Sequence, residues 1–247
     1  MENSSVGDDV RVIDATGKFV MPGGIDPHPH LEFEFMNTVS VDDFFSGQAA
    51  ALAGGTTMHI VFIFPTNGSL KAGFEAYEKK AKKSYMDYGF HMAVTKWDET
   101  VSREMELMVK EKCINSFKFF LVYKGFAMVN DVRLLEGFKK CKSLGALAMV
   151  HAENGDAVIE GQRKMIELGI TGPEGHALSR PAVTKREPKD LWQEPLVPAS
   201  SWTPCSDQRS WEPNGMKFES SIKNFSRSIH FFLLSNLKVT QDLCIFQ

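Results

Sequence analysis

The feature that most constrains the fold is an alternation of short apolar runs with amphipathic stretches, repeated five times between about residues 10 and 180. The apolar runs are rich in β-branched and aromatic residues, which favour strands, and the stretches between them show helical spacing of apolar residues. Strands that alternate with helices and are apolar on both faces predict a parallel sheet. The predicted strands cover 20–25, 56–64, 88–94, 116–122 and 146–150, and the predicted helices cover 40–55, 69–83, 102–112, 131–144 and 156–168.

The ends of two helices are indicated by their capping residues. Ser40 is the predicted N-cap of the first helix, with Asp42 and Asp43 in the first turn and Gly54 at the end. Gly145 follows the fourth helix and predicts its C-terminus.

Bulk composition excludes several classes of partner. The formal net charge of -3 gives no support for a nucleic acid partner. No apolar run approaches the roughly 20 residues that a spanning helix needs, and the first residues lack the pattern of a secretory signal, so we expect no membrane partner. The cysteines show neither paired spacing nor a C-x-x-C motif, which is typical of reduced thiols in a cytoplasmic protein; they are Cys113, Cys141, Cys205 and Cys244.

Two histidines, His28 and His30, follow the first predicted strand. In an extended chain, residues i and i+2 point to the same side, so both imidazoles would converge on one point, as metal ligands do. A loop with two incidental histidines explains this pair equally well when it is taken alone.

Polar residues at the ends of other strands favour the metal site. Lys118 lies in the apolar fourth strand, where desolvation would lower the pKa of its amine. A neutral amine can react with carbon dioxide to give a carbamate, an anionic ligand with two oxygens that can bridge two metal ions. A lysine that reaches water from a strand end is the alternative for an isolated case. His151 after the fifth strand, together with the H-x-H pair, favours the metal interpretation.

The remaining histidines receive no functional assignment. His59 and His91 lie inside predicted strands rather than at their ends, and His176 lies in the loop after the last predicted helix.

The gathering of polar groups at strand C-terminal ends favours a (β/α)8 TIM-type barrel, although open α/β sheets also bind ligands at that edge. No G-x-G-x-x-G or P-loop motif is present, so a nucleotide site gets little support.

Five segments together resemble the hydantoinase/dihydropyrimidinase family of the amidohydrolase superfamily, and its plant members most closely. The resemblance extends over about residues 10–181, and the segments that carry it are 17–30, 53–57, 115–118, 150–156 and 169–176.

The resemblance implies a zinc-dependent barrel that opens the ring of dihydrouracil, dihydrothymine or hydantoins by hydrolysing a cyclic amide. By that resemblance, His28 and His30 would hold the more buried of two Zn²⁺ ions, carboxylated Lys118 would bridge both ions, and His151 would hold the outer one. Tyr123 would contact the substrate and stabilise the developing oxyanion; the alternative is an interface tyrosine with a satisfied hydroxyl. The family also implies a homotetramer.

The same resemblance predicts the domain organisation. Residues 1–14 would be a remnant of a small β-sandwich domain, 15–181 an incomplete barrel of five β/α units, and 182–247 a non-homologous, poorly ordered tail. The family takes a histidine ligand from the sixth strand and a catalytic aspartate from the eighth, and neither is recognisable here, which predicts a truncated form. Two hypotheses remain open: a metal-dependent cyclic amide hydrolase, and a catalytically silent fragment or isoform that at most associates with full-length subunits.

Overall fold

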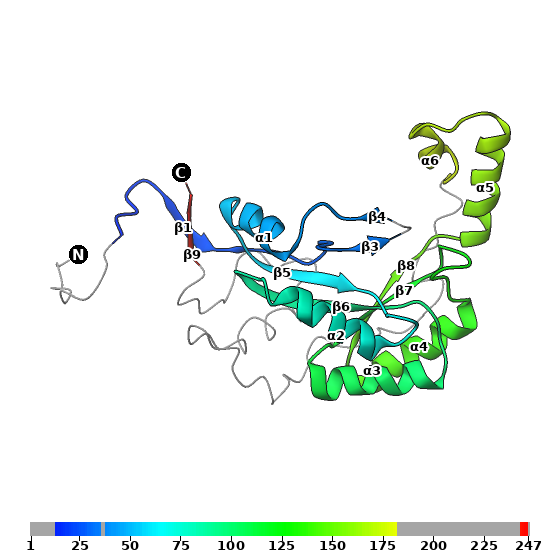
Figure 1. Cartoon of the computed structure of the whole chain (residues 1–247), viewed down its shortest axis with the longest axis horizontal. Helices are drawn as coiled ribbons and strands as arrows, with labels where there is room; N and C mark the ends of the chain where they lie inside the picture. Colours follow the sequence, from blue (N-terminus) through cyan, green and yellow to red (C-terminus); the bar gives the residue numbers. More distant parts are fainter. Residues whose placement is uncertain (1–12, 36–37, 182–242, 247) are drawn as a thin grey trace.

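A five-stranded sheet dominates the computed structural model, which describes residues 13–35, 38–181 and 243–246 of the chain. The strands follow the order β2-β5-β6-β7-β8, and every neighbouring pair is parallel. The sheet curls as part of a barrel (Figure 1). The predicted parallel sheet is therefore confirmed. The strands are β2 (Gly24–Asp26), β5 (Thr56–Ile63), β6 (Asp87–Val94), β7 (Ser116–Phe120) and β8 (Leu147–His151).

Six helices occur in the described part of the chain: α1 (Phe44–Ala53), α2 (Leu70–Ala81), α3 (Glu99–Lys112), α4 (Asp131–Leu144), α5 (Gly155–Glu167) and α6 (Glu174–Leu178). Figure 1 shows α2, α3 and α4 along one face of the sheet. We call this the outer face. None of the helices in the described ranges is long and apolar enough to cross a membrane.

The outer face and these helices form the main hydrophobic core. Because side chains alternate along a strand, every second residue of the central strands points to this core. Met105 of α3 and Phe138 of α4 pack against these strand residues. Six of the strand residues are fully or almost fully buried: Val61, Ile63, Met92, Val94, Phe117 and Phe119.

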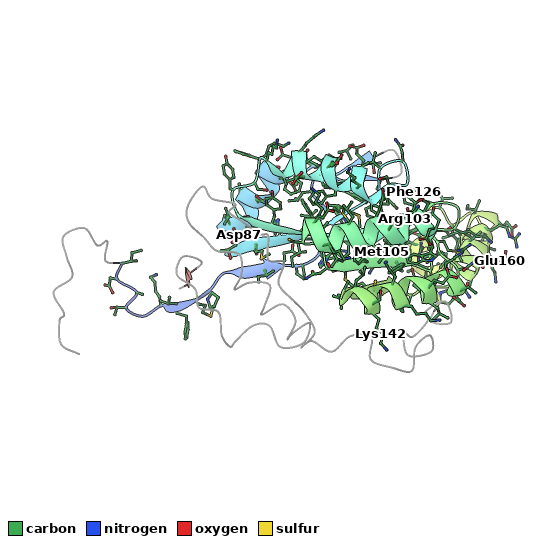
Figure 2. All side chains as sticks on the ribbon, turned by 90° about the horizontal axis from the view of Figure 1, so that it is seen from below. Asp87, Arg103, Met105, Phe126, Lys142 and Glu160 are labelled. Carbon is green, nitrogen blue, oxygen red and sulfur yellow. The ribbon has the colours of Figure 1, made fainter. Side chains whose placement is uncertain are left out.

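The two ends of the sheet are easily distinguished. Figure 2 shows Asp87, which begins β6, at the opposite end from Phe126, which lies in the loop after β7, while Lys142 of α4 points away from the sheet. In a parallel sheet the carboxyl ends of all strands meet at one edge. Residues that follow the strands, such as Phe126, therefore lie at this C-terminal edge.

The first helix begins later than the sequence predicted. The N-cap of α1 is Asp43, whose carboxylate accepts a hydrogen bond from the backbone N–H of Ser46 at 2.7 Å. The hydroxyl oxygen of Ser40, the predicted cap, instead accepts a hydrogen bond from the N–H of Phe33 at 2.8 Å. The prediction was wrong because a contact with a neighbouring loop uses the Ser40 side chain. Gly54 ends the helix as predicted.

Short strands account for other differences. The predicted strand 20–25 is divided into β1 (Phe19–Pro22) and β2, and β1 pairs antiparallel with β9 (Leu243–Phe246). Proline has no backbone N–H to donate, which favours a break at this point. A hairpin of β3 (Glu34–Phe35) and β4 (Thr38–Val39) was not predicted. Residues 1–12, 182–242 and 247 lie outside the described residues, so the predicted remnant domain and tail remain predictions.

Three local expectations are corrected. Helix α3 begins at Glu99 with Asp98 as its N-cap, one turn before the predicted start, because the Asp98 carboxylate accepts the N–H of Val101. His176 lies in α6 rather than in a loop. Cys141 is a free, buried thiol, whereas Cys113 is disulfide-bonded, because spacing along the chain does not measure distance in space.

Candidate active site

The residues predicted to form the site lie at the C-terminal edge of the sheet, except for Lys118, which lies in the middle of its strand. His28 and His30 follow β2, Lys118 lies in β7, His151 is the last residue of β8, and Tyr123 lies three residues after β7. β2 and β8 are the two edge strands of the sheet, so the predicted site residues extend across the whole width of the sheet.

His28 and His30 form a close pair. Their ring centroids are 5.4 Å apart with an edge-to-face arrangement. The ring of His28 also lies 4.3 Å from that of Phe62 in β5, and the ring of His30 stacks on Phe33 at 4.6 Å. The backbone N–H of His28 donates to the Asp26 carboxylate at 3.0 Å. Aromatic packing and this hydrogen bond hold the two imidazoles beside each other.

Lys118 occupies an apolar position in β7. It is only partly exposed, its neighbours Phe117 and Phe119 are fully buried, and its amine lies 5.8 Å from the ring centroid of Phe62. Desolvation lowers the pKa of this amine. A lowered pKa increases the fraction of neutral amine, which is the form that reacts with carbon dioxide.

The charges of the site interact across the curled sheet. The pKa of His28 is lowered, first by desolvation and then by the charges of Lys118 and His151, while Asp26 opposes the shift. The pKa of His30 is lowered by desolvation and by His28. The charges of Lys118 and His151 thus disfavour protonation of the His28 imidazole. Neutral imidazole is the form that ligates metals.

Glu153 is a residue of the site that sequence reasoning missed. Its carboxylate lies 2.7 Å from Nε2 of His151 and 3.9 Å from Nε of Arg180. A carboxylate beside one imidazole nitrogen orients the ring and leaves Nδ1 for another partner. The sequence did offer one indication of this contact, because Glu153 is only two residues from His151. Strand alternation could not establish it, since β8 ends at His151.

Tyr123 is held in an unusual backbone conformation. Its φ angle is 62°, in the left-handed region that a bulky residue rarely adopts. Its carbonyl oxygen accepts hydrogen bonds from the backbone N–H groups of Phe126, Ala127 and Met128 at 2.9, 3.0 and 3.2 Å. The ring centroid lies 5.9 Å from that of His151. Strain of this kind persists only where surrounding contacts maintain it, and it is frequent at functional sites.

Aromatic rings connect the two sides of the site. From His30 the contacts pass through the hairpin residues Phe33 and Phe35 to Tyr123, with centroid separations of 4.6, 5.5 and 5.8 Å. Phe126 packs on Phe35 at 5.3 Å. We call Phe33, Phe35 and Phe126 the aromatic wall of the site. Sequence reasoning did not identify it, although Phe33 and Phe35 are two residues apart, as expected for side chains on the same face of a strand.

The predicted metal ligands lie in two groups. Within residues 13–35, 38–181 and 243–246, no group of three His, Cys, Asp or Glu side chains could hold one metal ion. The candidate donors are instead the His28–His30 pair on one side and His151 on the other, with the Lys118 amine as the remaining group.

Comparison with protein families gives a match to the Amidohydrolase family over residues 19–177, more than half of the chain. The chain belongs to this family. The match contains every candidate site residue and all five strands of the parallel sheet. The sheet with its covering helices is therefore a partial amidohydrolase barrel, as predicted.

Individual relatives agree with this assignment. The chain is 76% identical over 185 residues to dihydropyrimidinase from Arabidopsis thaliana and 56% identical over 180 residues to dihydropyrimidinase from Dictyostelium discoideum. These alignments cover 75% and 72% of this chain. The crystal structure of dihydropyrimidinase from Brevibacillus agri superimposes with a TM-score of 0.69 at 41% identity, covering 72% of this chain and 39% of that one. The chain spans about a third of the length of the two curated relatives, 35% and 36% respectively.

Proposed function

We propose that this chain carries the metal-binding part of a cyclic amide hydrolase that opens the ring of dihydropyrimidines such as 5,6-dihydrouracil. The observation that carries the proposal is geometric: the ring of Phe62 packs on His28 at 4.3 Å and lies 5.8 Å from the Lys118 amine, and His151 ends the strand that pairs with β7. The high identity to dihydropyrimidinases from a plant and a slime mould supports the substrate class.

Each proposed residue has a role that its surroundings support. His28, His30 and His151 would hold the metal through neutral imidazole nitrogens, and Lys118, once carboxylated, would join the two positions. We propose Zn²⁺ because imidazole is a common zinc ligand. Bound metal would activate a water molecule and polarise the amide carbonyl.

Tyr123 would act on the substrate directly. Its ring lies beside His151, and a hydroxyl there could donate to the carbonyl oxygen as negative charge develops. The aromatic wall of Phe33, Phe35 and Phe126 would exclude water from one side of a flat heterocycle, because apolar rings offer no hydrogen bonds that compete with the amide.

The proposal extends to assembly and location. We propose a homotetramer on the basis of the family resemblance, and a cytoplasmic location on the basis of the free, buried thiol of Cys141, although the disulfide of Cys113 argues against that location. Light scattering of the purified chain and fractionation of cells that express it test these two points.

The decisive experiment is metal analysis of the purified full chain together with its intact mass. We expect about two zinc ions per chain, following the family pattern, and the added mass of one carbon dioxide. Lys118→Ala is expected to lose the added mass and most of the metal. Lys124→Ala, a change of an exposed lysine in the following loop, should lose neither.

Turnover of dihydrouracil by the metal-loaded chain, with loss of turnover in Tyr123→Phe, would support a hydrolase. A chain that binds no zinc and carries no adduct would contradict the proposal and favour the silent form that associates with full-length subunits.

A further inference from the structure

His91 is a buried polar residue in the interior of the partial barrel. It lies in β6 and is only 2% exposed. Its neighbours Met92 and Val94 belong to the core on the outer face, whereas Ala93 packs with Phe120 and Val122 in a second, smaller cluster on the opposite, inner face of the sheet. Alternation along the strand therefore places His91 on the inner face, the same face as Lys118.

The His91 ring has polar partners on two other strands. Its Nδ1 lies 2.5 Å from the hydroxyl oxygen of Ser116, the first residue of β7. The ring also makes a hydrogen bond to the backbone of Pro27. Proline offers only a carbonyl oxygen, so the ring must donate this bond. Since Nδ1 faces Ser116, we assign the proton to Nε2, and the Ser116 hydroxyl donates to Nδ1.

Each partner of His91 stands next to a proposed metal ligand. Pro27 directly precedes His28, and Ser116 is two residues from Lys118 on the same face of β7. The third neighbour, Phe62, has its ring centroid 4.7 Å from His91 and 4.3 Å from His28. The amine of Lys118 lies over the same phenyl ring.

The low pKa of the His91 imidazole keeps the ring neutral at physiological pH, in agreement with the hydrogen-bonding pattern assigned above. Burial is the main cause that lowers the pKa of His91 to about 4, and the charges of His28 and Lys118 add to the shift. Only a neutral imidazole can donate at one nitrogen and accept at the other.

We infer that His91 is a positioning residue that fixes the His28 segment relative to the strand that carries Lys118. Its two hydrogen bonds join the end of β2 to the start of β7 across the barrel interior, and its ring packs against the phenyl group that supports both ligands. That this positioning serves metal binding rests on the proposed function. The positioning of the His28 segment by His91 can itself be tested without metal.

His59 offers a matched control. It is a histidine in the adjacent strand β5, it is 4% exposed, and its alternation with Val61 places it on the outer face. Its Nδ1 has no hydrogen-bond partner among the described residues. Replacing His59 therefore removes an imidazole of similar burial from the opposite face of the sheet, next to Asp26 of β2 but without the two hydrogen bonds of His91.

The test compares His91→Phe, His91→Gln and Ser116→Ala with His59→Phe in the full chain. Phenylalanine keeps the ring volume and removes both hydrogen bonds, whereas glutamine retains a donor and an acceptor. Two readouts are needed: the ring resonances of His28 by NMR in the metal-free chain, and zinc affinity by competition with a chelating dye. Urea unfolding of each variant identifies loss of the fold.

We expect His91→Phe to shift the His28 resonances and to weaken zinc binding about 10- to 100-fold, the usual effect of removing a group that orients metal ligands. Ser116→Ala should act in the same direction with a smaller effect, and His91→Gln should restore part of the affinity. His59→Phe should change both readouts much less than His91→Phe does, even where it lowers stability, because it removes neither hydrogen bond of His91.

The inference is overturned if His91→Phe leaves the His28 resonances and zinc affinity unchanged, or if His59→Phe changes them as much. If the unaltered chain binds no zinc, the proposed function fails. The His28 resonances then still decide whether His91 positions that segment.

Discussion

The two faces of the central strands contain very different residues although they alternate along the same chain. The outer face of β7 presents Phe117 and Phe119 to the helices, while the inner face presents Ser116 and Lys118. The outer residues are fully buried and make only apolar contacts with α3 and α4, whereas the inner residues make the polar contacts of the site. Residues on the outer face therefore contribute mainly to folding stability, and residues on the inner face mainly to the proposed site. Substitutions of adjacent residues in one strand should thus affect either the unfolding free energy or metal binding.

The largest effect on stability is expected from Phe119→Ala on the outer face. The ring is fully buried, packs on Phe138 with centroids 5.6 Å apart, and lies close to Gly137. Removal of a buried phenyl group leaves a cavity and costs about 3–5 kcal/mol of unfolding free energy. Urea unfolding measures the loss, and Phe119→Leu, which retains most of the volume, should lose less. An equal loss in both variants would contradict the packing argument.

The next effect is a dependence of stability on pH that arises from the inner face. The pKa of His91 falls from 6.5 to about 4 on folding. A lowered pKa means that the unfolded chain binds more protons, so stability is complete above about pH 6.5 and is lost as the pH falls toward 4. The full shift corresponds to roughly 3 kcal/mol.

Urea unfolding between pH 4 and 7 checks this dependence. His91→Phe should reduce the slope of unfolding free energy against pH by about one proton, while part of the slope remains because burial also lowers the pKa of His28, His30 and His59. An unchanged slope would show that His91 is not buried as a neutral ring.

A smaller effect is expected from the helix layer that covers the outer face. The Asp98 carboxylate caps α3 by accepting the N–H of Val101 at 2.9 Å. Asp98→Ala should lower the unfolding free energy by about 1 kcal/mol, the usual cost of losing an N-cap. Asp98→Asn keeps the cap and removes the charge, so it should retain most of the stability. Zinc affinity should be the same in both variants, because α3 lies on the side away from the site.

Lys118→Met on the inner face is expected to change the unfolding free energy least and metal binding most. The substitution keeps an unbranched side chain and removes a desolvated amine, so the unfolding free energy should change by less than about 1 kcal/mol. The proposed carbon dioxide adduct and most of the proposed zinc binding should disappear. Mass spectrometry and metal analysis check this result, and destabilisation as large as that of Phe119→Ala would remove the distinction between the faces.

Local patterns predicted much of this organisation. Helix α4 has the predicted bounds 131–144 because apolar periodicity and Gly145 both mark them, and His151 lies where parallel strands bring groups to one edge. The β3–β4 hairpin escaped prediction because two-residue strands have too few residues to show a period. Ser40 and Asp43 are both good caps, and only a tertiary contact with Phe33 decides between them.

The contacts of His91 could not be predicted for a related reason. Its partners Pro27 and Ser116 are 64 and 25 residues away in sequence. Periodicity indicates that a strand residue is buried, but not which strands meet its side chain. The same limit applies to Glu153, whose role depends on the direction of the chain after β8 ends.

The backbone of Tyr123 has a practical consequence for enzymology. Three amide donors fix the main chain at Tyr123, and its ring packs against those of Phe35, Phe120 and His151, so ring contacts hold the aromatic group in place. Deleting the phenol oxygen should leave the phenyl group where it is. Any difference in rate between tyrosine and phenylalanine at this position would then measure one atom's contribution to the reaction, free of structural rearrangement.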